Sequence, residues 1–191
     1  MTEPSSGPSS RDRLLAATVE HVARHGLADL SLRALATAIG TSHRMLIYHF
    51  GSKEGLLAEV VATVEAGQRQ VMADLAATDE PTHLAVRRFW RGLTDPSVRE
   101  HERLFFEVVA QALQGRPGTE RLRETLVEPW LDVVAAGGVR RGLPPDVART
   151  QARLGMAVTR GLLLDLLATG DLDGVDAAME LFLDAFVPVE S

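Results

Sequence analysis

The side chains best suited to chemistry stand together in residues 31–53, and their types favour contact with nucleic acid. Residues 43–50 follow a helical pattern in which Leu46 and Phe50, four positions apart, can face a core. Arg44, Met45 and Tyr48 then point away from that core. A helix surface that carries a guanidinium and other polar groups can lie in the major groove of DNA and contact base edges. The pattern therefore predicts DNA recognition by this segment.

A second helix and a turn must hold this segment in place. The preceding segment repeats its apolar side chains at helical spacing, at Leu32, Leu35, Ala36 and Ile39. Gly40 follows, and the left-handed backbone that glycine tolerates can end that helix and turn the chain. Ser42 can cap the next helix by accepting a hydrogen bond from a free backbone N–H. A helix, a glycine turn and a second helix with a polar face together predict a helix-turn-helix.

These residues resemble the DNA-binding signature of the TetR family of bacterial transcription regulators. The matching positions read Ser31, Ile39-Gly40, Leu46-Ile47-Tyr48-His49-Phe50 and Ser52-Lys53-Glu54-Gly55-Leu56. The resemblance implies an all-α fold with an N-terminal three-helix helix-turn-helix head and a C-terminal helical body for ligand binding and dimerisation. It also implies a ligand-responsive repressor whose partners are a palindromic operator in double-stranded DNA, a small-molecule effector and a second copy of the chain.

The resemblance assigns DNA contacts to nine residues of this chain. They are Ser31, Arg33, Ser42, His43, Arg44, Met45, Tyr48, His49 and Lys53. Arg44 stands at the base-reading start of the recognition helix and can pair bidentately with guanine, whereas Met45 offers only apolar contact. Tyr48, His49 and Lys53 match phosphate-contacting positions, and a helix N-terminus at Lys53 would add backbone donors.

One position departs from the family pattern, since Ile47 stands where a tyrosine is most common. The change removes a hydroxyl that commonly reaches the DNA backbone, so binding is weaker or Tyr48 takes over the role. His49 has two interpretations, a phosphate contact and a packed structural histidine.

Charge is distributed unevenly along the chain. The 191 residues carry a formal net charge of −6, yet residues 10–53 hold six Arg or Lys against three Asp or Glu, a net +3. A basic head on an acidic body fits a protein that meets phosphate at one end, although chance clustering would also produce it. The chain has no cysteine and no apolar run long enough for a membrane helix, so we expect a soluble, cytoplasmic protein without membrane contact.

Helical periodicity continues to the end of the sequence, and no alternating strand pattern persists. We expect three parts: a disordered arm over 1–10, a helix-turn-helix domain over 11–53, and a helical body over 54–191. A long helix from Lys53 to about residue 77 would join head to body. The expected body helices span 81–93, 96–113, 119–136 with a kink or split at Pro129, 146–168 and 173–186, and a glycine- and proline-rich break separates residues 137–145.

The last two helices are more apolar than the surface of a monomer would tolerate. They predict either an ordinary core within one chain or a four-helix bundle shared by two copies, and the resemblance favours the two-fold pair. The expected dimer contacts are Leu154, Val158, Gly161, Leu162, Met179, Phe182 and Phe186.

Aromatic side chains gather in the middle helices, which suits a pocket for an apolar or aromatic effector. The candidate ligand contacts are Phe89, Trp90, Phe105, Phe106 and Trp130. Core packing explains each of them equally well. His101, Glu107 and Gln111 are candidate polar contacts for the same ligand.

Two other classes of function are open to a chain of this composition. An enzyme with a carboxylate-bridged metal centre needs repeated Glu-x-x-His pairs, but Glu80–His83 is the single such spacing and contains a proline. No motif for catalysis or for a cofactor occurs, so we expect neither activity nor a cofactor. The other class is a helical ligand-binding or interaction protein whose DNA binding is weak or lost, which the Ile47 departure keeps open.

Overall fold

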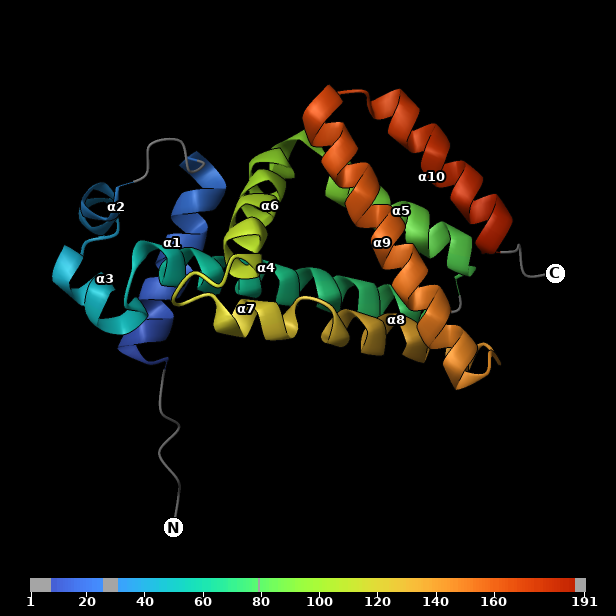
Figure 1. The fold of residues 1–191 in the computed structure, drawn as a ribbon, viewed down its shortest axis with the longest axis horizontal. Helices are drawn as coiled ribbons and strands as arrows, with labels where there is room; N and C mark the ends of the chain where they lie inside the picture. The colour runs from blue at the N-terminus through green and yellow to red at the C-terminus, as the bar shows by residue number, and fades with distance from the viewer. Residues whose placement is uncertain (1–7, 26–30, 79, 188–191) are drawn as a thin grey trace, which may run out of the picture.

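The computed structural model describes residues 8–25, 31–78 and 80–187, which fold as helices and connecting turns (Figure 1). No β-strand occurs among these residues, and the predicted all-α fold class is confirmed. Residues 1–7 of the predicted disordered arm lie outside the described residues.

Three short helices form the head: α1 (Ser10–His25), α2 (Leu32–Ala38) and α3 (His43–Phe50). The periodicity and cap signals predicted the bounds of α2 and α3 to within a residue, because both depend on residues no more than four positions apart. The helices share a small core of buried side chains, made of Leu35, Ala36, Leu46, Phe50 and Leu56.

The long helix α4 (Lys53–Ala76) leaves the head and runs the length of the body (Figure 1). Six more α-helices complete the body: α5 (Thr82–Thr94), α6 (Arg99–Leu113), α7 (Glu120–Thr125), α8 (Glu128–Arg140), α9 (Pro145–Thr169) and α10 (Leu172–Phe186). A 3-10 turn (Pro96–Val98) precedes α6. Helices α7 and α8 pack along α4, while α9 and α10 form an antiparallel pair in which α9 packs across α8 (Figure 1).

The end of α8 corrects one prediction. Pro129 splits the 119–136 segment as expected, but α8 continues to Arg140 through Gly137 and Gly138, which the sequence pattern wrongly placed in a break. The two glycines serve close packing instead. A Cβ on Gly137 would lie 3.3 Å from the Cβ of Ala76, and one on Gly138 would lie 3.1 Å from the Cβ of Ala148. Helices α4 and α9 therefore approach α8 where it has no side chains.

A second core joins head to body. Val22 of α1 packs with Val60 and Val61 of α4, and the same cluster includes Val108 of α6 and Leu122 of α7. One apolar cluster therefore contacts α1 of the head as well as α4, α6 and α7 of the body. Among the described helices, none is long and apolar enough to cross a membrane.

Candidate nucleic-acid interface and ligand cavity

Serine caps fix the ends of the helices that carry the predicted DNA contacts. The hydroxyl of Ser31 accepts from the backbone N–H of Ala34 at 3.1 Å, and that of Ser42 accepts from Met45 N–H at 3.2 Å. Ser52 caps α4 in the same way, at 3.0 Å from the N–H of Gly55. Each bond satisfies a donor that the first turn of a helix leaves free, so the start of each helix is well defined.

The turns beside the recognition helix α3 use glycine where the backbone requires it. Gly40 has φ 71° and Gly51 has φ 75°, in the left-handed region that side chains with a Cβ rarely adopt. The two turns orient α3 so that Leu46 and Phe50 are buried in the head. The opposite side of α3 is left to solvent.

That exposed side carries most of the predicted DNA contacts. Met45 is 37% exposed and Tyr48 is 77% exposed, and His43 and Arg44 are exposed beside them. Arg33 on α2 and Lys53 at the start of α4 are exposed as well. Within the described residues, no carboxylate lies within 4.0 Å of the cationic groups of Arg33, Arg44 and Lys53, so their charges are available to an external anion.

His49 and Ile47 sit differently from their neighbours on α3. His49 is half-buried, its ring lies edge-on to Tyr48 with centroids 5.0 Å apart, and its Nε2 atom is buried without a hydrogen-bond partner among the described residues. Ile47 is 37% exposed and faces solvent. The side chain of Ile47 therefore lies at the surface that would meet DNA.

A cavity of about 350 Å³ lies in the body. Its lining is mostly apolar and comes from α4, α5, α6, α8, α9 and α10. Three of the five predicted ligand contacts line it: Phe89, Phe105 and Trp130.

The other two predicted ligand contacts do not line the cavity. Trp90 is buried in the core and donates its Nε1–H to Asp176 Oδ1 at 2.6 Å. Phe106 packs edge-on against Phe105, with ring centroids 5.1 Å apart. Periodicity could not separate these residues from the lining ones, because all five lie on buried helix faces.

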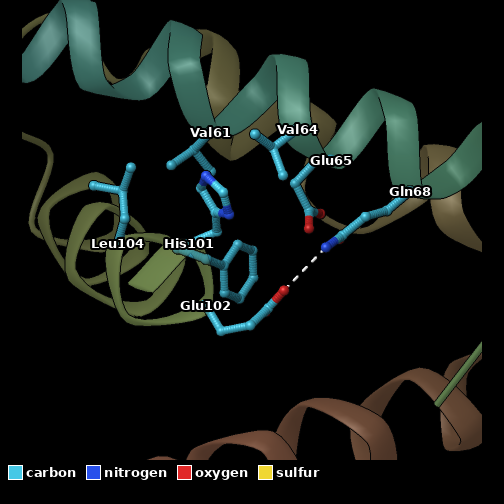
Figure 2. Close-up of a pocket in the computed structure, with 8 residues that line it drawn as sticks. Val61, Val64, Glu65, Gln68, His101, Glu102 and Leu104 are labelled. Carbon is cyan, nitrogen blue, oxygen red and sulfur yellow. Dashed lines mark hydrogen bonds between the residues drawn. The ribbon is translucent and has the colours of Figure 1, made fainter. Parts of the chain in front are cut away.

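The cavity is also lined by charged side chains that the sequence pattern did not single out. Glu65 of α4 accepts from Trp130 Nε1 at 2.7 Å and from Arg160 Nη2 of α9 at 3.2 Å. Glu102 of α6 accepts from Gln68 Nε2 of α4 at 2.9 Å. Figure 2 shows Glu65, Gln68 and Glu102 converging from two helices on one space. The available signal was a pair of polar residues, Glu65 and Gln68, inside the apolar stripe of α4.

Burial shifts the ionisation of all three charged groups. It raises the pKa of Glu65, against the opposing effect of Arg160 and the hydrogen bond from Trp130. It raises the pKa of Glu102 to about 7, with the neighbouring Glu65 adding to the rise and Gln68 opposing it. It lowers the pKa of Arg160, although the Glu65 carboxylate acts in the other direction.

The three predicted polar contacts occupy other places. His101 lines a small neighbouring cavity of about 10 Å³ beside Val61 and Leu104 (Figure 2). Glu107 lies on the outside of α6, where its Oε1 accepts from Gln111 Nε2 at 3.4 Å. None of the three side chains, His101, Glu107 and Gln111, is in the lining of the larger cavity.

The predicted dimer residues divide into three environments. Met179 is 1% exposed and packs in the core of its own chain, which removes it from any surface contact. Leu154, Phe182 and Phe186 line the cavity, with the two phenylalanine rings stacked 5.5 Å apart. Val158 and Leu162 are half-buried, and Gly161 is exposed. Among the described residues, no group of three or more His, Asp or Glu side chains is placed to hold a metal ion.

Comparison with known proteins finds the same organisation elsewhere. Residues 14–60 match the profile described as "Bacterial regulatory proteins, tetR family". The HTH-type transcriptional repressor AcnR of Corynebacterium diphtheriae is 28% identical over 191 aligned residues, which cover 90% of this chain and 88% of AcnR. The matched profile spans α1 to the beginning of α4, where the caps and the exposed side chains of α3 lie.

Solved structures share the complete fold. The TetR transcriptional regulator from Legionella pneumophila superposes with a TM-score of 0.68 at 18% identity, over 95% of this chain and 99% of that one. The multidrug binding protein EbrR, complexed with imidazole, has a TM-score of 0.64 at 23% identity, over 97% and 98% of the two chains. The head and the body thus recur together in these proteins.

Proposed function

This chain belongs to the TetR family of bacterial regulatory proteins, and from that premise we propose that it is a ligand-responsive repressor of transcription. It binds an operator as a homodimer and leaves it when a small, largely apolar molecule fills the cavity of the body. The observation that carries the proposal is the capped helix α3, which exposes Arg44 and Tyr48 while Leu46 and Phe50 anchor it in the head.

Some of the exposed side chains contact bases and the others contact phosphates. Arg44 reads a base edge from the N-terminal part of α3, where its guanidinium can form two parallel hydrogen bonds to guanine. His43 and Met45 contact neighbouring bases. Arg33, Tyr48 and Lys53 hold phosphates, as Ser31, Ser42 and His49 do nearby, and these contacts set the register of the head on the duplex.

Two outward stripes on α9 and α10 support a homodimer. Exposed small and apolar residues recur along them at helical spacing: Leu154, Ala157, Gly161, Leu164 and Ala168 on α9, and Ala177, Ala178, Leu181 and Ala185 on α10. Leu181 is 71% exposed and Leu164 is 53% exposed in the single chain. A second copy covers such stripes by forming a four-helix bundle, with Val158 and Leu162 at its edges.

Ligand binding releases the DNA through the contacts between body and head. Glu59 of α4 lies between Arg11 of α1, at 3.0 Å, and Arg121 of α7, at 3.5 Å. A ligand in the cavity contacts α4 and α6 directly and shifts α4 together with the head. The two heads then no longer match adjacent major grooves roughly 34–36 Å apart. EbrR, a protein of this fold that binds imidazole, supports the cavity as a ligand site.

The test is binding of the purified protein to the DNA upstream of its own gene, measured by fluorescence anisotropy against a scrambled duplex. We expect the upstream duplex to bind roughly a thousandfold more tightly. The affinity should also fall steeply as salt rises, because phosphate contacts release counterions.

Equal, weak binding to both duplexes would overturn the proposal. It would favour the alternative, a helical ligand-binding or interaction protein that has lost its grip on DNA. If the exposed Ile47 is the cause of the lost DNA binding, we expect Ile47→Tyr to restore binding to the upstream duplex.

A further inference from the structure

The charged side chains that line the cavity are unequally paired. The lining holds two carboxylates, Glu65 of α4 and Glu102 of α6, and two guanidiniums, Arg160 of α9 and Arg141 after the end of α8. Arg141 donates to two backbone oxygens, from Nη1 to Gly137 at 3.2 Å and from Nη2 to Glu80 at 3.4 Å.

Arg160 already forms an ion pair with Glu65. Its Nη2 donates to Glu65 Oε2 at 3.2 Å and to the backbone oxygen of Leu126 at 2.8 Å. Its guanidinium carbon lies 5.1 Å from the centre of the Phe105 ring. Arg69 is on the same helix as Glu65, and its guanidinium carbon lies 6.0 Å from the centre of the Trp130 ring. Its positive charge also favours the ionised form of Glu65. Glu65 therefore has its cationic partner.

Glu102 has no such partner. Its one hydrogen bond among the described residues comes from the neutral amide of Gln68, and its nearest charged neighbours are Glu65, which repels it, and the already paired Arg160. The side chain is 5% exposed, yet it lines the cavity, so the cavity is the space from which a partner can reach it. A buried carboxylate without a cation takes up a proton instead, and burial raises the pKa of Glu102 to about 7.

We propose that the cavity takes a largely apolar molecule bearing one positive charge, seated against Glu102 beside the aromatic rings. The rings of Phe89, Phe105 and Trp130 give the lining apolar surface for the rest of such a molecule. An anion seated against Glu102 would be repelled by that carboxylate and by Glu65, and a neutral molecule would leave Glu102 without a counter-charge. A volume of about 350 Å³ suits a molecule with one or two rings. The inference rests on the proposed function only in taking the cavity as the ligand site.

The test compares benzyltrimethylammonium with neopentylbenzene, which has the same shape and no charge. Each is titrated into the full chain without DNA, and the fluorescence of Trp130, which lines the cavity, reports binding. We expect the cation to bind at least about tenfold more tightly above neutral pH. Its affinity should rise by about tenfold from about pH 6 to about pH 8, because the carboxylate must be ionised, while that of the neutral probe stays level or falls.

Glu102→Gln should remove the preference for the cation and its pH dependence while both probes still bind. Glu107→Gln is the matched control, an exposed carboxylate on the same helix, and should change neither. If Glu102→Gln does not fold, the pH dependence of the wild-type protein decides. Equal affinities for the two probes, no binding of the cation at millimolar concentration, or a preference that survives Glu102→Gln would each overturn the inference.

The two proposals fail in distinguishable ways. If the protein binds its upstream DNA and a neutral effector releases it, while the cation shows no preference, the charge inference alone is wrong. If the cation binds through Glu102 but the upstream DNA is not recognised, the repressor proposal is wrong and the ligand class stands.

Discussion

Burial of Glu102 against α4 links the stability of the fold to pH. Because its pKa rises from 4.5 to about 7 on folding, the folded chain holds a proton that the unfolded chain releases between these values. The free energy of unfolding therefore falls as pH rises through this range, by about 3 kcal/mol at most from this group. The raised pKa of Glu65 acts in the same direction.

Glu102→Gln should flatten this dependence, since an amide keeps the size of the side chain and cannot ionise. We expect the variant to gain stability over wild type by about 1–3 kcal/mol near pH 8, with little gain near pH 5. Urea unfolding followed by far-ultraviolet circular dichroism at both pH values measures it. Glu107→Gln should follow the wild-type curve, and a constant offset at both pH values would contradict the explanation.

Arg44 is the residue whose loss should change sequence preference. Arg44→Ala should weaken binding to the upstream duplex by about 1–3 kcal/mol and relax discrimination at one base-pair position. Anisotropy on duplexes with single base changes detects this. Arg103→Ala removes the same charge from the exposed side of α6 and is the control. An equal loss in both variants would mean that Arg44 contributes only to net charge.

At the scale of elements, the contact of the α6–α7 loop with α4 joins the body to the head. Gly118 has φ 88°, and a Cβ there would lie 2.9 Å from Gly55 Cα and 3.2 Å from Gly55 N. Gly55 itself must lack a side chain, because a Cβ would come 2.4 Å from the backbone oxygen of Phe50, the last residue of α3. The loop thus presses on the first turn of α4, next to the recognition helix.

Gly118→Ala should destabilise the fold by more than Gly115→Ala does. Both glycines have positive φ, but a Cβ on Gly115 meets nothing within 4 Å, so backbone strain alone applies there. We expect about 1 kcal/mol for that strain and at least about 1 kcal/mol more for Gly118→Ala. Thermal unfolding of the two variants gives the difference. Equal losses would show that the loop yields without moving α4.

At the scale of the whole molecule, the proposed repressor needs two heads held together to span an operator, and the outward stripes of α9 and α10 are our proposed means. Leu181→Glu should turn the dimer into a monomer at micromolar concentration, because a carboxylate would be buried without a partner at the interface. Affinity for the upstream duplex should fall with it. Sedimentation equilibrium measures the association.

Leu113→Glu provides the control for Leu181→Glu. Leu113 is 69% exposed, close to Leu181 at 71%, and lies on α6 outside the two stripes. Leu113→Glu should leave the dimer intact. A dimer that persists in Leu181→Glu would place the contact between copies elsewhere.

The sequence by itself determined the features that depend on near neighbours. The capping serine Ser42, the turn at Gly40 and the buried pair of Leu46 and Phe50 were all predicted, because helix caps and helix faces involve residues within one turn. The all-α class followed from the same periodicity. These local signals also carried the family resemblance, since the signature is one continuous stretch.

Only the tertiary structure decided which residues of different helices are in contact. Gly137 and Gly138 looked like a break because the side chains that fill their space, Ala76 and Ala148, belong to other helices. Trp90 and Trp130 are alike in pattern, yet one lines the cavity and the other does not. Glu102 of α6 receives a hydrogen bond from neutral Gln68 of α4, while Arg160 of α9 pairs with Glu65, and only the packing of the three helices decides this pairing. Distances across helices depend on packing, and periodicity along one helix contains no information about them.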